Sequence, residues 1–334
     1  MAAEPAANEA EALWYVGPGR AEIRVGSVAA PGAGGVRVRA LYGALSRGTE
    51  RLVFLGRVPE SEYQRMRAPF MSGAFPFPVK YGYATVGRVE AGPEELIDKP
   101  VFALHPHQSV FTVPADAVVP LPPGVPPARA VLAANMETAL NAVWDAAPGP
   151  ADHIAIVGGG VIGSLVAWLC GRIPGTQTTL VDVEPTRATT ARALGVGFAS
   201  PGEAPADCDL VFHASGHADG LATALALAGD EAAVIEMSWY GIGDVAIPLG
   251  GAFHSRRLRL VSSQVGRVSP SHRARWTHRR RLAAALDLLA DPALDALLAA
   301  AVPFHHLPVL LPQILARESG ILCPLIRYPA EAAG

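Results

Sequence analysis

The stretch His153–Gly163, which reads HIAIVGGGVIG, decides the fold of this chain, because an apolar run passes directly into the pattern G-x-G-x-x-G. It predicts a buried strand over 153–158 and a helix over 160–172, joined by a tight turn. Gly158 permits the turn, Gly160 lets another group approach the backbone, and Gly163 lets the helix pack on the strand. The first helical N–H groups, those of Val161 and Ile162 among them, have no intrahelical partner and favour a phosphate.

An acid follows this turn at the position where a dinucleotide-binding unit needs one. Asp182 stands near the carboxyl end of the next apolar run, TTLVDV, where a carboxylate accepts hydrogen bonds from the adenosine ribose. The same charge repels a 2′-phosphate, so NAD(H) is favoured as the cofactor. Arg187, on the following predicted helix, keeps NADP(H) possible. The alternative is that Asp182 only caps the helix that follows it.

Apolar strands alternate with helices from about residue 150 to 267, which predicts right-handed βαβ crossovers and a parallel sheet. The fold class is therefore α/β, with a doubly wound Rossmann sheet over 126–267. Ligands of such sheets bind beyond the carboxyl ends of the strands. We therefore expect further cofactor contacts after the later strands, from Ser215, Gly216 and Trp239.

The segment before this unit has a different residue pattern, with short β-type runs between Gly and Pro turns from 13 to 125. One helix over 126–146 leads out of this first domain. Residues 1–12 are expected to be a disordered leader, and 268–334 are assigned to the first domain. The leader carries no basic and apolar signal-peptide pattern, so the predicted location is cytoplasmic.

Composition excludes several classes of protein. The chain has 334 residues, a net charge of −3, and three widely spaced cysteines. No apolar run approaches the ~20 residues of a membrane span, and three cysteines form no disulfide framework. The expected partner is a small-molecule substrate, without nucleic acid or membrane.

Two further segments support a family resemblance. Residues 42–56, YGALSRGTERLVFLG, resemble the stretch where zinc-type alcohol dehydrogenases carry a Cys-x-x-Asp motif, and 80–90, KYGYATVGRVE, resemble their Gly-His-Glu segment. The order of domains resembles the medium-chain dehydrogenase/reductase superfamily over nearly the whole chain, with short motifs closest to bacteriochlorophyllide dehydrogenase-like members. The resemblance implies a GroES-like β-barrel catalytic domain beside the Rossmann domain, and a homodimer.

The departures from that family concern its metal ligands. Ser46 or Arg47 stands where the family has a zinc-binding cysteine, Tyr83 where it has a histidine, and Ala84 where it has an acid. A catalytic zinc needs about three converging N, S or O ligands. We therefore predict a zinc-independent enzyme with no metal site. His105 and His107 remain alternative metal ligands, although a role in a loop or in the lining of a substrate cleft is favoured for them.

Without a Lewis acid, hydrogen-bond donors must stabilise the charge on a reacting oxygen. The resemblance puts Tyr83, Thr49 and Ser46 where the family keeps ligands and a relay hydroxyl, so they are the candidate catalytic groups, with core packing or turn hydrogen bonds as the alternative. Glu50 and Glu137 are candidate orienting carboxylates. An arginine-rich stretch over 256–281 is either a solvated surface or a site for an anionic substrate.

The leading hypothesis is a metal-free NAD(P)(H)-dependent dehydrogenase that interconverts a secondary alcohol and a ketone on a bulky, biosynthetic and anionic substrate. One alternative is a reductase of an activated C=C bond. Another is a cofactor-binding protein without catalysis, such as a redox sensor or an assembly partner.

Overall fold

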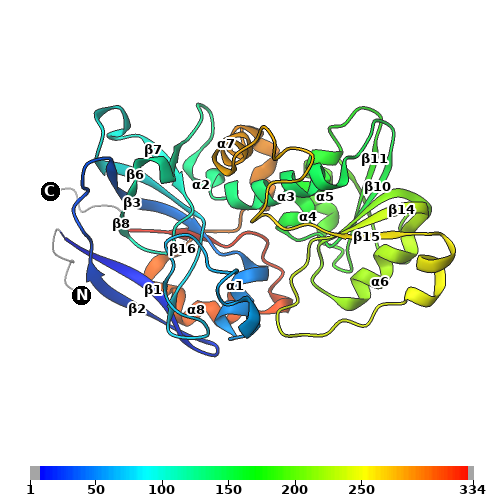
Figure 1. Ribbon diagram of the computed structural model, residues 1–334, viewed down its shortest axis with the longest axis horizontal. Helices are drawn as coiled ribbons and strands as arrows, with labels where there is room; N and C mark the ends of the chain where they lie inside the picture. The colour runs from blue at the N-terminus through cyan, green and yellow to red at the C-terminus, as the bar shows by residue number, and fades with distance from the viewer. Residues whose placement is uncertain (1–7, 330–334) are drawn as a thin grey trace. The chain divides into compact units, whose positions relative to one another are not determined.

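The computed structural model describes residues 8–329, and the chain divides into two compact units (Figure 1). Unit 1 runs to Ala134 and resumes at Leu298, and unit 2 covers Asn135–Leu297. The prediction that 268–334 belong to the first domain is therefore wrong for 268–297, because buried contacts tie this stretch into unit 2. The predicted leader lies outside the described residues at 1–7, whereas strand β1 begins at Glu9 and pairs with β2.

Unit 1 is built from two sheets in which nearly all strands pair antiparallel. The four-stranded sheet has the order β2-β1-β5-β4, with bounds Arg20–Ser27, Glu9–Gly17, Val79–Lys80 and Ser72–Gly73. The seven-stranded sheet has the order β16-β17-β3-β6-β7-β9 with β8 beside β3, with bounds Val302–Pro303, Leu325–Arg327, Gly35–Ala44, Thr85–Ala91, Pro100–Ala103, Val118–Pro120 and Val110–Pro114. Alternate residues of β3 and β8, such as Val38 and Phe111, point into one apolar core, as period-2 patterning predicts.

The helices of unit 1 are short and lie between its strands. They are α1 (Arg47–Phe54), α2 (Pro127–Ala130) and α8 (Leu307–Ile314). Single 3-10 turns occupy Glu60–Glu62, Glu94–Leu96, Ala115–Ala117, Phe304–His306 and Arg317–Ser319. Helix α1 carries Thr49 and Glu50, and Ser46 stands at its N-cap position.

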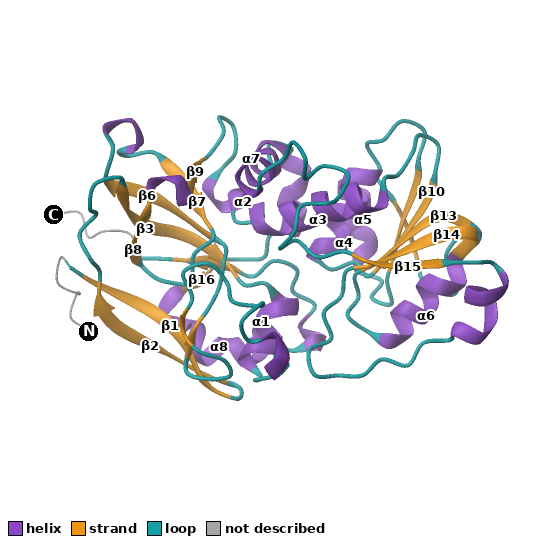
Figure 2. Cartoon of the chain, viewed as in Figure 1, coloured by secondary structure: helices purple, strands orange, loops and turns teal. Residues whose placement is uncertain are grey.

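Unit 2 contains a six-stranded, fully parallel sheet in the order β12-β11-β10-β13-β14-β15 (Figure 2). The strands are Gly197–Ala199, Gln177–Val181, His153–Val157, Cys208–His213, Ala228–Glu236 and Arg259–Ser262. The chain fills one side of β10 first and then crosses to the other. The point where strand order reverses therefore lies between β10 and β13, which is the usual binding position in such sheets.

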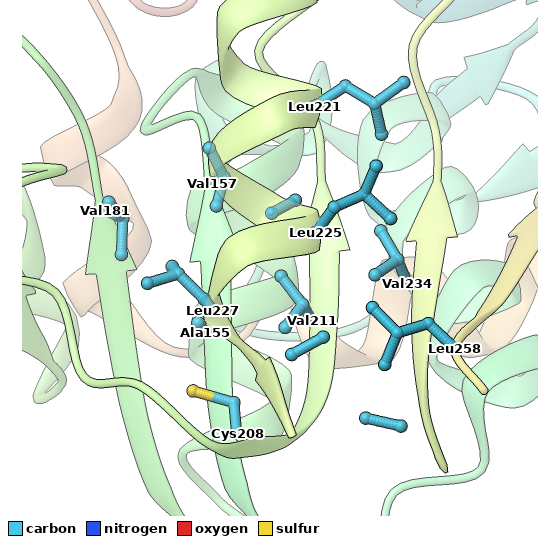
Figure 3. Packing of buried hydrophobic residues seen from close by; sticks show 13 residues of the cluster. Ala155, Val157, Val181, Cys208, Val211, Leu221, Leu225, Leu227, Val234 and Leu258 are labelled. Carbon is cyan, nitrogen blue, oxygen red and sulfur yellow. The ribbon is translucent and has the colours of Figure 1, made fainter. Parts of the chain in front are cut away.

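Helices follow the strands of unit 2 as the alternating pattern predicts. They are α3 (Ala133–Ala146), α4 (Val161–Cys170), α5 (Arg187–Leu194), α6 (Ala218–Leu227) and α7 (His278–Leu288), with shorter turns at Leu249–Phe253 and Pro292–Leu297. Figure 3 shows Leu221 and Leu225 projecting from α6 toward the valines of the strands, among them Val157 and Val234. This layer of buried aliphatic side chains holds α6 on the sheet.

The single helix predicted over 126–146 is in fact two, α2 and α3, because the helical run is interrupted before Ala133. Strand β14 directly follows α6. Within residues 8–329, no helix combines the length and apolar composition that crossing a bilayer requires.

Candidate functional site

The glycine-rich turn of unit 2 is closely packed at its two ends and open in its middle. Gly158 has φ 111°, and a Cβ there would lie 2.5 Å from the Ser215 amide nitrogen. A Cβ on Gly163 would overlap the Gly158 carbonyl oxygen. At Gly160, the N-cap of α4, a Cβ would meet no atom within 4 Å. Only glycine fits the two ends, and the open middle lets a ligand reach the backbone.

Asp182 is held against this turn at the end of β11. Its Oδ2 accepts a hydrogen bond from the Gly159 N–H at 2.5 Å, and its Oδ1 accepts one from the Glu184 N–H at 2.8 Å. Arg187, the first residue of α5, passes close to Gly159. The first-turn N–H groups of α4, including those of Val161 and Ile162, have no partner inside the helix. The residues present thus fit a dinucleotide, with phosphate donors beside a fixed ribose acceptor.

The loops after β13 and β14 carry the remaining predicted cofactor contacts. Ser215 is exposed, and the Gly216 N–H donates to the Ser238 hydroxyl at 3.0 Å. Trp239 is partly buried in the neighbouring loop. The two loops are therefore hydrogen-bonded to each other.

Sequence reasoning missed two residues at the same place, His213 and Glu236. His213 is fully buried, and its Nδ1 lies 2.8 Å from a Glu236 carboxylate oxygen. The two residues are register partners at the ends of β13 and β14. A polar residue at the end of each of two neighbouring apolar strands was the available signal.

A second cluster of polar groups lies in unit 1, around the fully buried carboxylate of Glu50. One of its oxygens accepts from the Ser46 N–H at 2.8 Å. The other accepts from the Tyr15 hydroxyl at 2.7 Å and lies 2.8 Å from His107 Nε2. Burying a carboxylate costs free energy unless it is hydrogen-bonded, and these contacts provide the hydrogen bonds.

Tyr83 lies in the same cluster, between α1 and the start of β6. The side chains of Ser46 and Thr49 lie close enough to its phenol to affect its pKa. Burial and the Glu50 charge raise the pKa of Tyr83 to about 12, although Ser46 and Thr49 pull it down. The phenol therefore stays protonated at neutral pH. The structure thus brings together Tyr83, Thr49 and Ser46, the three hydroxyls singled out from the sequence.

Glu137, the fourth predicted catalytic residue, has a different environment. It lies on α3 in unit 2, where Arg281 Nε donates to it at 3.0 Å, and both side chains are buried. Burial raises the pKa of Glu137, while the charge and hydrogen bond of Arg281 lower it. The carboxylate is thus engaged in a buried ion pair.

The two histidines at 105 and 107 have separate partners. The His105 ring stacks on Phe111 with 3.9 Å between centroids, and burial lowers the pKa of His105 to about 3. His107 instead contacts Glu50. Within the described part of the chain, no group of three or more His, Cys, Asp or Glu side chains is placed to hold a metal ion.

Several residues of the arginine-rich stretch have partners in unit 2. Arg256 Nη1 lies 3.0 Å from an Asp207 oxygen, and Arg280 lies over the Trp276 ring at 4.0 Å. Arg281 is the buried partner of Glu137. Arg273 and Arg275 are exposed. Much of the stretch therefore serves local structure.

No family model and no curated protein matches this chain in sequence. Solved structures do match it in fold. L-idonate 5-dehydrogenase from Escherichia coli K-12 aligns with a TM-score of 0.77 at 15% identity, covering 96% of this chain and 98% of that chain. A short chain alcohol dehydrogenase from Escherichia coli CFT073, complexed with NADH, aligns with a TM-score of 0.74 at 16% identity, covering 96% and 99%.

A third match comes from Sinorhizobium meliloti, a protein described as a zinc-binding dehydrogenase and bound to NADP. It aligns with a TM-score of 0.76 at 19% identity, covering 96% of this chain and 99% of that chain. Together with the parallel sheet and the antiparallel unit 1, these alignments confirm the predicted fold class. The chain has the α/β fold of the medium-chain alcohol dehydrogenases, a GroES-like unit joined to a Rossmann unit.

Proposed function

We propose that this chain is an NAD(P)(H)-dependent oxidoreductase that interconverts a secondary alcohol and a ketone. The observation that carries the proposal is the turn at Gly158–Gly163 with Asp182 fixed beside it. Open backbone at Gly160, unpaired helix N–H groups and a carboxylate on the next strand are what a pyrophosphate and a ribose require. The fold shared with dehydrogenases supports the same reading.

We propose NAD(H) as the preferred form of the cofactor. Both Asp182 oxygens accept backbone N–H groups, which hold the carboxylate in place. A 2′-phosphate brought to this position meets a fixed negative charge. Arg187 stands near enough to the turn to offset part of that repulsion, so NADP(H) binds in second place.

The chemistry on the substrate falls to the hydroxyl cluster of unit 1. Bound cofactor supplies or accepts a hydride at the nicotinamide ring. Tyr83, protonated at neutral pH, donates a hydrogen bond and then a proton to the oxygen that becomes an alkoxide. Ser46 and Thr49 orient the phenol and stabilise its phenolate afterwards. Glu50, held by Tyr15 and His107, keeps the phenolate from forming early.

This assignment is zinc-independent because hydroxyls take the places where the resemblance puts ligands. The proposal expects purified, active protein to contain well below one zinc per chain by elemental analysis, and chelator treatment to leave the rate unchanged. A stoichiometric metal whose removal abolishes turnover would overturn this part of the proposal.

The substrate proposed is a bulky anionic alcohol or ketone. The exposed guanidinium groups of Arg273 and Arg275 offer bidentate contacts to a carboxylate or phosphate. Deuterated cofactor identifies the reaction: label on the carbinol carbon of the product supports alcohol–ketone chemistry. Label on a carbon beta to a carbonyl would instead establish reduction of a C=C bond.

Calorimetric titration with NADH and NADPH tests the cofactor proposal directly. We expect saturable NADH binding that is tighter than NADPH binding, and an Asp182→Ser variant in which the preference narrows or reverses. Asp209→Ser is the matched control, because Asp209 also accepts a backbone N–H, that of His153. Folded protein that takes up neither nucleotide would refute the proposal.

A further inference from the structure

A chain of three side chains links the exposed rim of unit 2 to its interior. His213, with no exposed surface, lies between Glu236 on its Nδ1 side, at 2.8 Å, and Ser215 on its Nε2 side, at 2.6 Å. Glu236 is held in turn by the Ser238 N–H at 2.7 Å and by the Tyr240 hydroxyl at 3.1 Å. Both ring nitrogens of His213 therefore have a partner, and the histidine holds the Ser215 hydroxyl in place.

The partners determine which hydrogen bond each group makes. A carboxylate only accepts hydrogen bonds, so the Nδ1 of His213 carries a hydrogen and donates a hydrogen bond to Glu236. Burial opposes ionisation of Glu236, but the His213 contact and the Ser238 N–H outweigh it and lower the pKa of this carboxyl. With a hydrogen on Nδ1, the Nε2 of His213 can accept a hydrogen bond from the Ser215 hydroxyl. The exposed Ser215 oxygen accepts the His217 N–H at 3.2 Å, and its second lone pair remains for a hydrogen bond from a ligand.

The position of Ser215 relates this oxygen to the glycine-rich turn. The Ala214 N–H donates to the Val157 carbonyl at 2.8 Å, which ties the loop to the end of β10. A Cβ at Gly158 would crowd the Ser215 backbone, and one at Gly220 would overlap the Ser215 hydroxyl. Glycines thus make room on both sides for the serine and its loop.

The strand order indicates which half of a dinucleotide reaches this oxygen. Asp182 follows β11, on one side of β10, and receives the adenosine. Ser215 follows β13, on the other side of β10. A pyrophosphate at the start of α4 therefore directs the second sugar toward Ser215.

We propose that Ser215 binds the sugar hydroxyls of the nicotinamide half of the cofactor, and that His213 and Glu236 are positioning residues for it. The inference rests on the proposed function. It goes beyond it because it assigns the hydrogen-bonded side chains of Ser215, His213 and Glu236 to the orientation of the cofactor. Ser215 accepts a ribose O–H because its own proton is committed to His213.

The same order of Ser, His and acid occurs in hydrolases, where the serine attacks an ester. The backbone donors here speak against that role. The His217 N–H already donates to the Ser215 oxygen at 3.2 Å, and the Gly216 N–H donates to Ser238. The N–H groups next to Ser215 are thus taken, whereas an oxyanion hole needs them free.

The test compares NADH with ADP, which lacks the nicotinamide half. For Ser215→Ala we expect about a tenfold rise in the Kd of NADH with the Kd of ADP within twofold of wild type. Glu236→Gln keeps the shape but removes the charge, and we expect about a threefold rise for NADH alone. Thr223→Ala on α6 removes a hydroxyl bonded only locally, to the Asp219 carbonyl, and is the control that leaves both values unchanged.

An unchanged NADH affinity in Ser215→Ala would overturn the inference, and so would an equal loss for NADH and ADP, which marks a merely structural role. Labelling of Ser215 by a fluorophosphonate, detected by peptide mass, would overturn it in favour of a nucleophile. If the wild-type protein binds ADP but neither NADH nor NADPH, the proposed function itself fails. The two failures are therefore distinguishable.

Discussion

At the scale of single residues, burial determines whether Tyr83 keeps its proton. A phenol in water loses its proton near pH 10, but removal from water and the nearby Glu50 charge raise the pKa of Tyr83 to about 12. The Ser46 and Thr49 hydroxyls favour the phenolate and keep the shift from growing further. Tyr83 thereby remains a proton donor at neutral pH, which reduction of a carbonyl needs.

Replacing Tyr83 with Phe removes this donor and little volume. We expect the rate of carbonyl reduction to fall by about 10²–10⁴ while NADH affinity is retained, because the loss concerns the transition state. Steady-state rates and the calorimetric Kd measure the two effects. Tyr81→Phe, a neighbouring buried phenol whose ring lies edge-on to Tyr83, is the control. Equal losses in both variants would contradict the assigned role.

The same pKa predicts opposite pH dependences for the two directions. Reduction needs the phenol, which is the dominant form well below pH 12, so its chemical step stays flat between about pH 6 and 10. Oxidation needs the phenolate, so its rate rises with pH over that range. Single-turnover rates in each direction test this pattern, and a pH-independent oxidation step would refute it.

At the scale of elements, the glycine turn separates packing from ligand binding. A Cβ at Gly163 would overlap the Gly158 carbonyl, whereas one at Gly160 would meet nothing. We expect Gly163→Ala to lower both the free energy of unfolding and NADH affinity. Gly160→Ala should unfold like wild type and yet bind NADH at least tenfold more weakly, because its methyl group takes the place of the pyrophosphate.

Denaturant unfolding and NADH titration of both variants check this prediction. Gly202→Ala, at an exposed position where a Cβ would also meet nothing within 4 Å, is the control. If Gly160→Ala binds NADH as wild type does, the turn is a structural corner with no ligand.

Helices α3 and α7 are joined by the buried pair Glu137–Arg281. Arg281 Nη1 also donates to Asn141 at 2.5 Å and Nη2 to the Val265 carbonyl at 2.6 Å. Removing one partner strands a buried charge, so we expect Arg281→Met to lower the free energy of unfolding by about 3–5 kcal/mol. The double variant Arg281→Met/Glu137→Leu should regain most of it, and Arg280→Met should cost about 1 kcal/mol or less.

The loss of unfolding free energy in Arg281→Met is expected to depend on pH. Burial already raises the pKa of Glu137, and loss of Arg281 removes what lowers it. Below the unfolded-state pKa the carboxyl is protonated in both states and needs no counter-charge, so the cost is small there. It grows as pH rises through the folded-state pKa. Urea unfolding at pH 4.5 and 7.5 tests this, and an equal cost at both values would contradict it.

At the scale of the whole molecule, the parallel sheet ends at an uncovered strand. Within residues 8–329, β15 pairs only with β14, and Val261 on it is 39% exposed. Exposed edge strands invite pairing with another chain. We therefore propose that two copies join at β15 into a homodimer, as the family resemblance implies.

A Val261→Lys variant places a charge on that edge. We expect it to sediment as a monomer where the wild type sediments as a dimer, with unchanged NADH affinity. Val309→Lys, at a more exposed valine on α8, is the control that leaves the dimer intact. A dimer that persists in Val261→Lys, or a monomeric wild type, would refute the β15 interface.

Local patterns predicted the parts of this protein whose residues are close in sequence. The strand, turn and helix at 153–170 form from adjacent residues, and Asp182 follows on the next strand, so spacing alone placed them. Helix α5 is likewise ended by a local signal, Gly195, which follows Leu194 in a left-handed conformation. The domain boundary near 268–297 was missed because buried contacts between distant segments decide it.

By itself the sequence determined the alternation of strands and helices and the glycine turn with its acid, because each depends on residue type and short spacing. Only the tertiary structure decided which polar groups meet. Glu50 is joined to Tyr15 and His107, and His213 to Glu236, through pairs far apart in the chain. Burial then sets their charges and pKa values, since desolvation depends on what packs around a group and no local pattern encodes that.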